Sequence, residues 1–273
     1  MVRDLNMTRG RARGSARRGG TLALGLLVVA ATAAPGCTSD TTGTLCSVPI
    51  EETILEALIA DIDGRTLVEL AFKRAPMEGE RVEDLSALYL CDGDAVTINQ
   101  ANARPIERAQ GQPVYSITQD NASRQYEVVL ESDREFFRFF ITVGTQSLTL
   151  LSPDPARDWG VGYSRAEPLD IAWAPAATED APVSIDIVDE IDGVPCLANF
   201  AVEFVASGDT LTVPADTITL KPGVDAGESC PASIRVTRGA VAQIDPASGN
   251  SAALHSSSAL AFVIRQVLIE SLP

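Results

Sequence analysis

Alternation of apolar and polar residues along short runs constrains the fold of this chain more than any other feature. It predicts β-strands with one buried face, because successive side chains on a strand point to opposite sides. Turn-forming Gly, Pro and Asp residues separate the runs roughly every 8–15 residues, a spacing typical of β-sandwiches. We therefore expect an all-β fold of antiparallel β-sandwich type. The runs lie at 66–73, 125–130, 137–143, 169–173, 183–187, 202–204, 234–236 and 259–269, the last being interrupted by Arg265.

The segment 51–62 fits two interpretations, because its apolar residues also have helical spacing. Asp63-Gly64 follows it directly, and an Asp-Gly pair between two apolar runs is a strong signal for a tight hairpin turn. We therefore favour a strand before this turn, paired with the strand that begins near residue 66.

The segment 151–168 divides the rest of the chain into two halves of similar length. It holds three prolines and two glycines without a sustained apolar period, which is typical of a connector. About a hundred residues lie on either side, the usual size of a small sandwich domain. We expect two consecutive domains joined by a linker at 151–168: a β domain at 46–150 and an Ig- or fibronectin-III-like β-sandwich domain at 169–273.

The first 36 residues have the features of an export signal. Six arginines precede an apolar run of fourteen residues at 21–34, which is too short to span a bilayer as a mature helix. The following Ala34-Pro35-Gly36-Cys37 resembles the lipobox of bacterial lipoproteins, in which the leader is cut before an acylated cysteine. The resemblance implies a signal peptide at 1–36, a lipid on Cys37 and a tether at 37–45. The alternative is a plain secretory peptide, cleaved near Ala33 or Gly36, that leaves Cys37 as a spare thiol.

The cysteine count supports lipidation of Cys37. The chain has five cysteines, an odd number, whereas thiols of exported proteins tend to pair. With Cys37 on the lipid, four remain, and these allow three connectivities. Chain order favours Cys46–Cys91 and Cys196–Cys230, because each pair then lies within one half of the chain. No CxxC motif or Cys/His cluster is present, so the sequence does not indicate a zinc site.

Two resemblances support this layout. The segment Leu169-Asp170-Ile171-Ala172-Trp173-Ala174-Pro175 resembles the L-x-V-x-W-x-P strand of fibronectin type III modules. The order of a YLCDGD segment at 89–94, this strand, and an arginine-bearing end at 259–273 resembles uncharacterised exported bacterial lipoproteins with two β-sandwich-like domains. The second resemblance implies a two-domain surface lipoprotein and no particular activity.

The charge of the chain excludes one class of partner. It has 21 basic and 37 acidic side chains, a net charge of −16. Cleavage after residue 36 would remove six arginines and one acid and leave a net charge of −21. Such a surface repels phosphate backbones and anionic lipid headgroups. We therefore expect no nucleic-acid partner and contact with the membrane only through the lipid on Cys37.

The sequence offers no convincing set of catalytic residues. His255 is the only histidine, and it precedes three serines in a Gly/Ser/Ala-rich stretch that we interpret as an exposed loop. No G-x-S-x-G nucleophile motif occurs. Glycoside hydrolysis needs two carboxylates facing a cleft, and sugar-binding sites usually add exposed aromatic side chains. Of the two tryptophans, Trp173 alternates with core residues. For Trp159, in the connector beside Tyr163, stacking against a sugar is the alternative, and we favour packing between the domains. We therefore assign no catalytic residue.

Calcium is a further alternative, because oxygen ligands at strand ends could hold this cation. Acidic residues gather in three places: Asp61 with Asp63; Asp92 with Asp94; and Asp186, Asp189, Glu190 and Asp192. Three of these aspartates precede glycine, however, and Asp-Gly pairs are ordinary turn formers. None of the clusters follows the twelve-residue calcium-loop pattern. We favour turns and assign no metal ligand and no cofactor.

Together these features predict a lipid-anchored protein of the bacterial cell envelope, on the periplasmic or cell-surface side. Its expected role is structural or binding, with another envelope protein or a glycan as the partner. An exported carbohydrate-active enzyme and a calcium-stabilised adhesion module are the alternatives.

Overall fold

The computed structural model describes residues 43–108, 112–131, 136–145, 147–158, 160–189, 196–198, 200–248, 250 and 253–273. These ranges belong to one compact unit, Thr41–Pro273. The expected signal peptide, Cys37 and Trp159 lie outside the described residues. Among the helices in the described ranges, none is long and apolar enough to cross a membrane.

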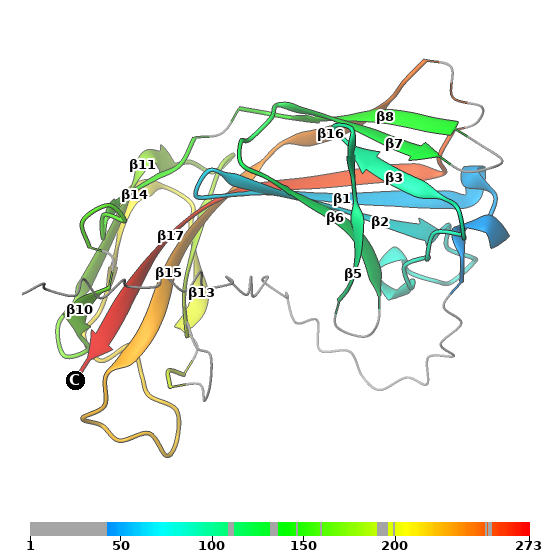
Figure 1. Ribbon diagram of the computed structural model, residues 1–273. Coiled ribbons are helices and arrows are strands. Elements are labelled where there is room, and N and C mark those ends of the chain that lie inside the picture. Colours follow the sequence, from blue (N-terminus) through cyan, green and yellow to red (C-terminus); the bar gives the residue numbers. More distant parts are fainter. Residues whose placement is uncertain are drawn as a thin grey trace, which may run out of the picture. The chain divides into compact units, whose positions relative to one another are not determined.

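The fold is all-β, which confirms the expectation from the alternating runs (Figure 1). The described helical segments are single 3₁₀ turns at Leu45–Ser47, Ile50–Glu52 and Val82–Asp84. The segment with two interpretations is a strand, β1, and it forms a hairpin with β2. Asp63 and Gly64 form the turn with φ values of 49° and 84°, the left-handed backbone that Asp-Gly accommodates.

The strands form three sheets. The nine-stranded sheet has the order β13-β12-β15-β17-β1-β2-β6-β5, with β10 also pairing to β17. Its strands are β1 (Thr53–Ile62), β2 (Arg65–Arg74), β5 (Arg104–Glu107), β6 (Pro113–Gln119), β10 (Val161–Ser164), β12 (Val183–Asp189), β13 (Phe200–Val205), β15 (Cys230–Ala240) and β17 (Ser256–Leu272). The five-stranded sheet, β16-β8-β7-β3-β4, contains β3 (Ala95–Ile98), β4 (Ala101–Asn102), β7 (Gln125–Glu131), β8 (Phe136–Val143) and β16 (Ala242–Pro246). The three-stranded sheet, β14-β11-β9, contains β9 (Thr149–Ser152), β11 (Leu169–Ala177) and β14 (Gly208–Val213).

Two hydrophobic cores lie against the nine-stranded sheet. The first packs the five-stranded sheet against β1, β2 and β6, with Phe72 and Tyr126 among its largest buried side chains. The second packs the three-stranded sheet against β12, β15 and most of β17, around the fully buried Trp173. We call these layers the first sandwich and the second sandwich.

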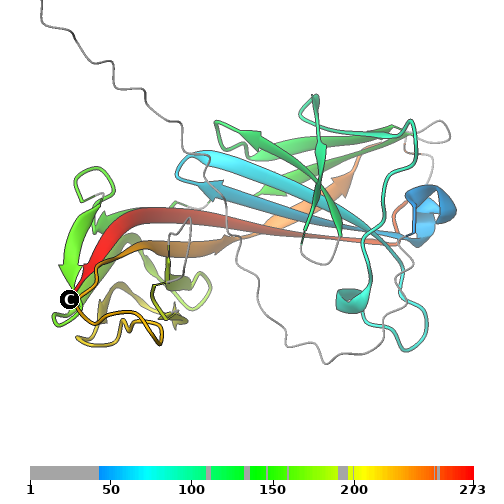
Figure 2. The ribbon, with the colours of Figure 1, turned by 60° about the horizontal axis from the view of Figure 1, so that its bottom comes forward.

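Strand β17 belongs to both sandwiches and runs through Arg265 without a break (Figure 2). The long strand expected at 259–269 is therefore confirmed, and Arg265 interrupts only its apolar pattern. The guanidinium of Arg265 bonds to the Asp61 carboxylate at 3.0 Å and to the carbonyl oxygen of Ile264 at 2.8 Å, so its charge is paired within the sheet. Along its first half β17 runs parallel to β1, from Ile54 opposite Ser256 to Ile62 opposite Ile264. This pair departs from the antiparallel pattern that holds for most of the fold.

Each core also contains residues from the other of the two halves expected from the sequence. Leu148 and Leu150, from the expected first half, pack in the second core. Strand β16, from the expected second half, pairs with β8, and its Ile244 packs against the first core. Alternation identifies a strand and its buried face, but the partner of a strand depends on contacts distant in sequence.

Candidate functional site

The two disulfides have the connectivity that chain order favours. Cys46 pairs with Cys91, and Cys196 pairs with Cys230, each with a Cα–Cα distance of 5.8 Å. The first disulfide holds the YLCDGD segment 89–94 against the beginning of the folded unit. The same contact is reinforced by main-chain hydrogen bonds, from Leu45 N to Tyr89 O at 2.7 Å and from Tyr89 N to Gly43 O at 3.1 Å.

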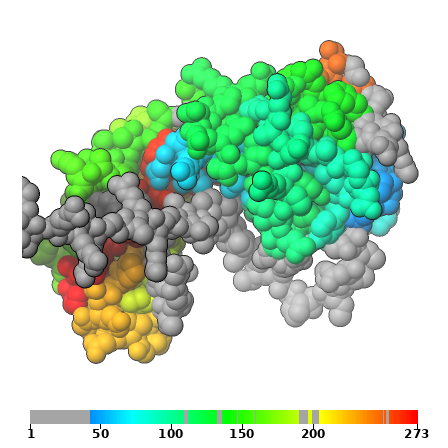
Figure 3. Space-filling model, viewed as in Figure 1, coloured from blue at the N-terminus to red at the C-terminus, as the bar shows by residue number. Residues whose placement is uncertain are grey.

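An open groove of about 630 Å³ lies beside this segment, in the first sandwich. It is bounded by β3 and β4 of the five-stranded sheet and by β5 and β6 of the nine-stranded sheet. Figure 1 labels β3, β5 and β6, and in Figure 3 atoms coloured cyan to green, for this part of the chain, cover the visible face of the first sandwich. We call it the edge groove. Its lining is mostly aliphatic and proline side chains with two tyrosines, two carboxylates and one amide: Leu90, Ala95, Val96, Ala103, Pro105, Ile106, Pro113, Tyr89, Tyr115, Asp94, Glu107 and Asn102.

The edge groove forms where the chain crosses between the two sheets. Strand β4 ends at Asn102 and β5 begins at Arg104, so Ala103 makes the crossing. The N–H of Ala103 donates to the carbonyl oxygen of Val96 on β3 at 2.8 Å. Beyond this hydrogen bond the groove lies between residues 94–96 on one side and residues 105–107 on the other.

Two tyrosines hold the wall of the groove in place. The buried Tyr115 accepts a hydrogen bond at its hydroxyl from the N–H of Leu90 at 2.6 Å. Tyr89 donates its hydroxyl hydrogen to the Glu107 carboxylate at 3.3 Å. Burial raises the pKa of Tyr115, and loss of hydration together with the negative charge of Glu107 raises the pKa of Tyr89. Both hydroxyls therefore stay protonated at neutral pH, and Tyr89 remains a hydrogen-bond donor.

The acidic side chains of the groove lie in different surroundings. The half-buried Asp94 accepts a hydrogen bond from the N–H of Cys91 at 3.3 Å, which closes the turn around Gly93. Glu107 is exposed on β5. None of the described residues that line the groove is basic. The surface of the edge groove is therefore apolar with a negative character.

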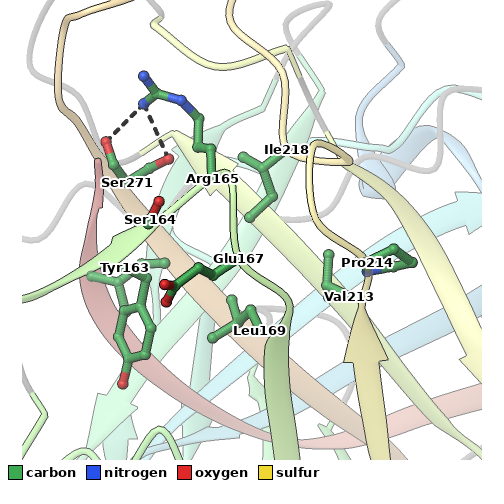
Figure 4. Close-up of a pocket in the computed structure, with 10 residues that line it drawn as sticks. Tyr163, Ser164, Arg165, Glu167, Leu169, Val213, Pro214, Ile218 and Ser271 are labelled. Carbon is green, nitrogen blue, oxygen red and sulfur yellow. Dashed lines mark hydrogen bonds between the residues drawn. The ribbon is translucent and has the colours of Figure 1, made fainter. Parts of the chain in front are cut away.

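The second sandwich has a much smaller cavity, of about 10 Å³ (Figure 4). Arg165 beside it donates to the carbonyl and hydroxyl oxygens of Ser271 at 2.9 and 3.4 Å. Its other terminal nitrogen donates to the carbonyl oxygens of Ala226 and Glu228 at 3.0 and 2.9 Å. The cavity has room for about one water molecule. Arg165 thus fastens the end of β17 to a neighbouring loop, and this pocket is a structural feature.

The acidic clusters considered for calcium are held in other interactions. Asp61 bonds to Arg265, and Asp63 accepts a hydrogen bond from the N–H of Gln266 at 3.3 Å. Asp189 accepts from the N–H of Leu197 at 2.8 Å and lies 3.6 Å from the ammonium of Lys221.

Asp186 and Asp189 lie on opposite faces of the sheet. The register pairs Asp186 with Arg235, whereas Asp189 lies opposite Ala232, which is part of the second core. In the part of the chain that the structure describes, three or more potential ligands do not gather anywhere; Glu190 and Asp192 lie outside it.

His255 is exposed at the start of β17, where its N–H donates to the carbonyl oxygen of Thr53 at 2.9 Å. Ser256, Ser257 and Ser258, which follow it, belong to the strand and lie opposite β1. The stretch interpreted as a loop thus already begins the strand at Ser256. Trp173 is a core residue, as its alternation with Leu169 and Ile171 predicts.

Most residues of the edge groove were not singled out from the sequence. Within 89–94 the sequence pointed to Cys91 as a disulfide partner and to Asp94 as part of an acidic cluster, but not to a groove, and Asn102, Glu107 and Tyr115 carried no motif. One available signal was Pro105, because proline within a strand indicates an edge strand.

Comparison with known proteins adds no relative: the sequence matches no protein-family model and has no significant match among curated proteins.

Proposed function

We propose that this protein is an exported, lipid-anchored protein of the cell envelope that binds a partner through the edge groove without catalysis. The observation that carries the binding role is the groove itself. A volume of about 630 Å³ falls in the range of ligand-binding clefts, and its mostly apolar lining with a few polar groups is typical of them.

Export is supported by the covalent structure of the described unit. Two disulfides are characteristic of proteins that fold in an oxidising compartment. The arginine-rich start, the apolar run at 21–34 and Cys37 after Gly36 supply the sequence support for a lipid anchor.

The surroundings of the two carboxylates favour binding over hydrolysis. A glycosidase needs one carboxyl group kept protonated by an apolar pocket, beside a second carboxylate that stays ionised. Glu107 is exposed, and Asp94 accepts a hydrogen bond from a main-chain N–H. Neither of them is an enclosed general acid.

The test is cross-linking in intact cells of the source organism, with the tagged full-length chain, followed by fractionation and identification of the captured molecules. Four forms are compared: wild type, Cys37→Ser, Asn102→Trp, and Gln243→Trp. Asn102 is exposed on the edge strand β4 and lines the groove, so an indole there should fill it. Gln243 is the matched control, exposed on β16 at the opposite edge of the same sheet.

We expect wild type and both tryptophan variants to sediment with membranes, and Cys37→Ser to become soluble. We expect Asn102→Trp to capture at least about tenfold less partner than wild type, because a filled groove excludes the partner. Gln243→Trp should capture as much as wild type does. Continued sedimentation of Cys37→Ser would refute the anchor. Equal capture by Asn102→Trp and wild type would refute the role of the groove.

A further inference from the structure

We propose that the edge groove binds an extended peptide segment with basic side chains, which adds to the nine-stranded sheet along β5. This inference rests on the proposed binding role of the groove and names the chemistry of the partner.

Strand β5 is an edge of the sheet, with β6 as its neighbour on one side (Figure 1). The N–H of Arg108 donates to the carbonyl oxygen of Gln112 at 2.9 Å, which makes these residues a hydrogen-bonded pair. Such pairs alternate along antiparallel strands. The pairs Ile106–Val114 and Arg104–Ser116 are therefore hydrogen-bonded, whereas Glu107–Pro113 and Pro105–Tyr115 are not.

The prolines agree with this assignment. Pro113 and Pro105 have no N–H group. Both belong to the pairs without hydrogen bonds between β5 and β6, so neither strand loses a bond to the missing N–H. The N–H and C=O of Glu107 and the C=O of Pro105 consequently point away from β6. The bond from Ala103 N–H to Val96, two residues before Pro105, points the same way, toward β3. The chain itself thus forms a main-chain hydrogen bond with this edge at Ala103, and the groove begins beyond that bond.

A peptide strand is the occupant that fits such an edge. Strand addition gains main-chain hydrogen bonds, and pockets for alternate side chains then provide selectivity. Pro105 and the short length of β5 limit the edge to a few bonds and protect it from unselective sheet growth. Pro105 and Leu90 line the groove and supply apolar surface for alternate side chains of a peptide.

The negative charge of the groove favours a peptide with basic side chains. Asp94 and Glu107 both line the groove, and none of its described lining residues is basic. Arg104 and Arg108 alternate with Pro105 and Glu107, so they belong to the other side of the strand, where Arg108 pairs with Glu69. The acidic balance of the whole chain acts in the same direction and disfavours anionic ligands.

A saccharide fits the groove less well. Sugar-binding sites commonly present open aromatic faces, but Tyr115 is 4% exposed and the hydroxyl of Tyr89 is engaged by Glu107. A neutral oligosaccharide is therefore the competing ligand in the test.

The test measures fluorescence anisotropy with the full tagged chain, purified in detergent at low salt. The probes are labelled hexapeptides of alternating Lys and Val, or alternating Glu and Val. Two N-methylated forms of the Lys/Val peptide carry the methyl groups on either alternate set of amides, and unlabelled maltohexaose serves as competitor. We expect the Lys/Val peptide to bind at least about tenfold more tightly than the Glu/Val peptide. At least one methylated form should bind about tenfold more weakly, because strand addition uses the N–H of every second amide.

Three variants locate the binding. Glu107→Gln and Asp94→Asn keep a hydrogen-bond acceptor for Tyr89 and Cys91, and each should weaken the Lys/Val peptide about threefold to tenfold. Glu179→Gln, exposed in a turn of the second sandwich, is the matched control and should leave affinity unchanged. Equal affinity for both peptides, full affinity of both methylated forms, or displacement by maltohexaose would overturn the inference. Such a result, with groove-dependent capture in cells intact, would leave the proposed function standing; loss of that capture would remove both.

Discussion

The two sandwiches share one sheet and one strand, β17, yet among the described residues the first has an open groove at an edge and the second has a small cavity. In the first, the chain crosses between sheets at Ala103 and leaves a groove of about 630 Å³. In the second, Arg165 fastens the end of β17 to a neighbouring loop and leaves about 10 Å³. The first sandwich therefore has a groove where its sheet edges separate, which we propose as the binding site, and we assign the second sandwich the role of a scaffold.

The disulfides follow the same division. Cys46–Cys91 holds the wall of the edge groove, whereas Cys196–Cys230 ties the start of β15 to the segment after β12, in the second core. Both bonds stabilise the fold, but the first also positions the residues that would contact a ligand.

The largest expected effect tests whether the second sandwich stabilises the whole fold. Trp173→Ala removes a fully buried indole and should lower the free energy of unfolding by about 3–5 kcal/mol. Because β17 continues through both cores, we expect a single transition in urea, measured by circular dichroism. Phe204→Ala is the control and should change little, because Phe204 lies on the edge strand β13 and is 74% exposed. Two separate transitions would contradict a shared scaffold.

Removal of each disulfide sharpens the comparison. The double variants Cys46→Ser/Cys91→Ser and Cys196→Ser/Cys230→Ser should each have a free energy of unfolding about 3–4 kcal/mol lower than wild type. The two losses are similar because both bonds close loops of similar length. Only the first should also weaken binding of the Lys/Val peptide, measured by anisotropy under conditions where both variants are folded. Equal loss of binding in both would show that the wall of the groove does not depend on its own disulfide.

The closure of the second sandwich depends on Arg165. Arg165→Met keeps the aliphatic stem but leaves the carbonyl oxygens of Ala226 and Glu228 without this donor, so we expect a loss of about 1–3 kcal/mol. Hydrogen exchange should increase in β10 and at the end of β17. Arg157→Met, which removes an exposed ion pair with Asp154, is the control. Unchanged hydrogen exchange in Arg165→Met would show that the hydrogen bonds of Arg165 are not needed to hold the end of β17.

The smallest effect concerns pH. Burial raises the pKa of Asp186, and the charge of Arg235 opposes the shift only in part. The folded protein therefore holds this proton at a higher pH than the unfolded chain does. The contribution of Asp186 to stability is favourable at low pH and is lost as pH rises through its raised pKa.

Asp186→Asn should accordingly raise stability at neutral pH by about 1 kcal/mol, measured by thermal unfolding, with the gain disappearing in acid. Asp245→Asn, exposed on β16, is the control. A gain that does not depend on pH would contradict this account of Asp186.

Local features were predictable because their causes are local. The strand at 66–73, the Asp63-Gly64 turn and the burial of Trp173 follow from side-chain period and backbone preference alone. The disulfide pairing agreed with chain order, since both bonds connect segments less than fifty residues apart. Arg265 shows the limit: the sequence shows a charge within an apolar run, but only the tertiary structure places its partner, Asp61, beside it.

The sequence by itself determined the class of fold, the positions of most strands, the hairpin at Asp63-Gly64 and the acidic character of the surface. Only the tertiary structure decided that β1 and β17 run in parallel, that β9 and β16 pair outside their own halves, and that Asp94 and Glu107 line one groove. The physical reason is that alternation records which face of a strand is buried, whereas sheet order and the separation of sheet edges depend on packing between segments far apart in the chain.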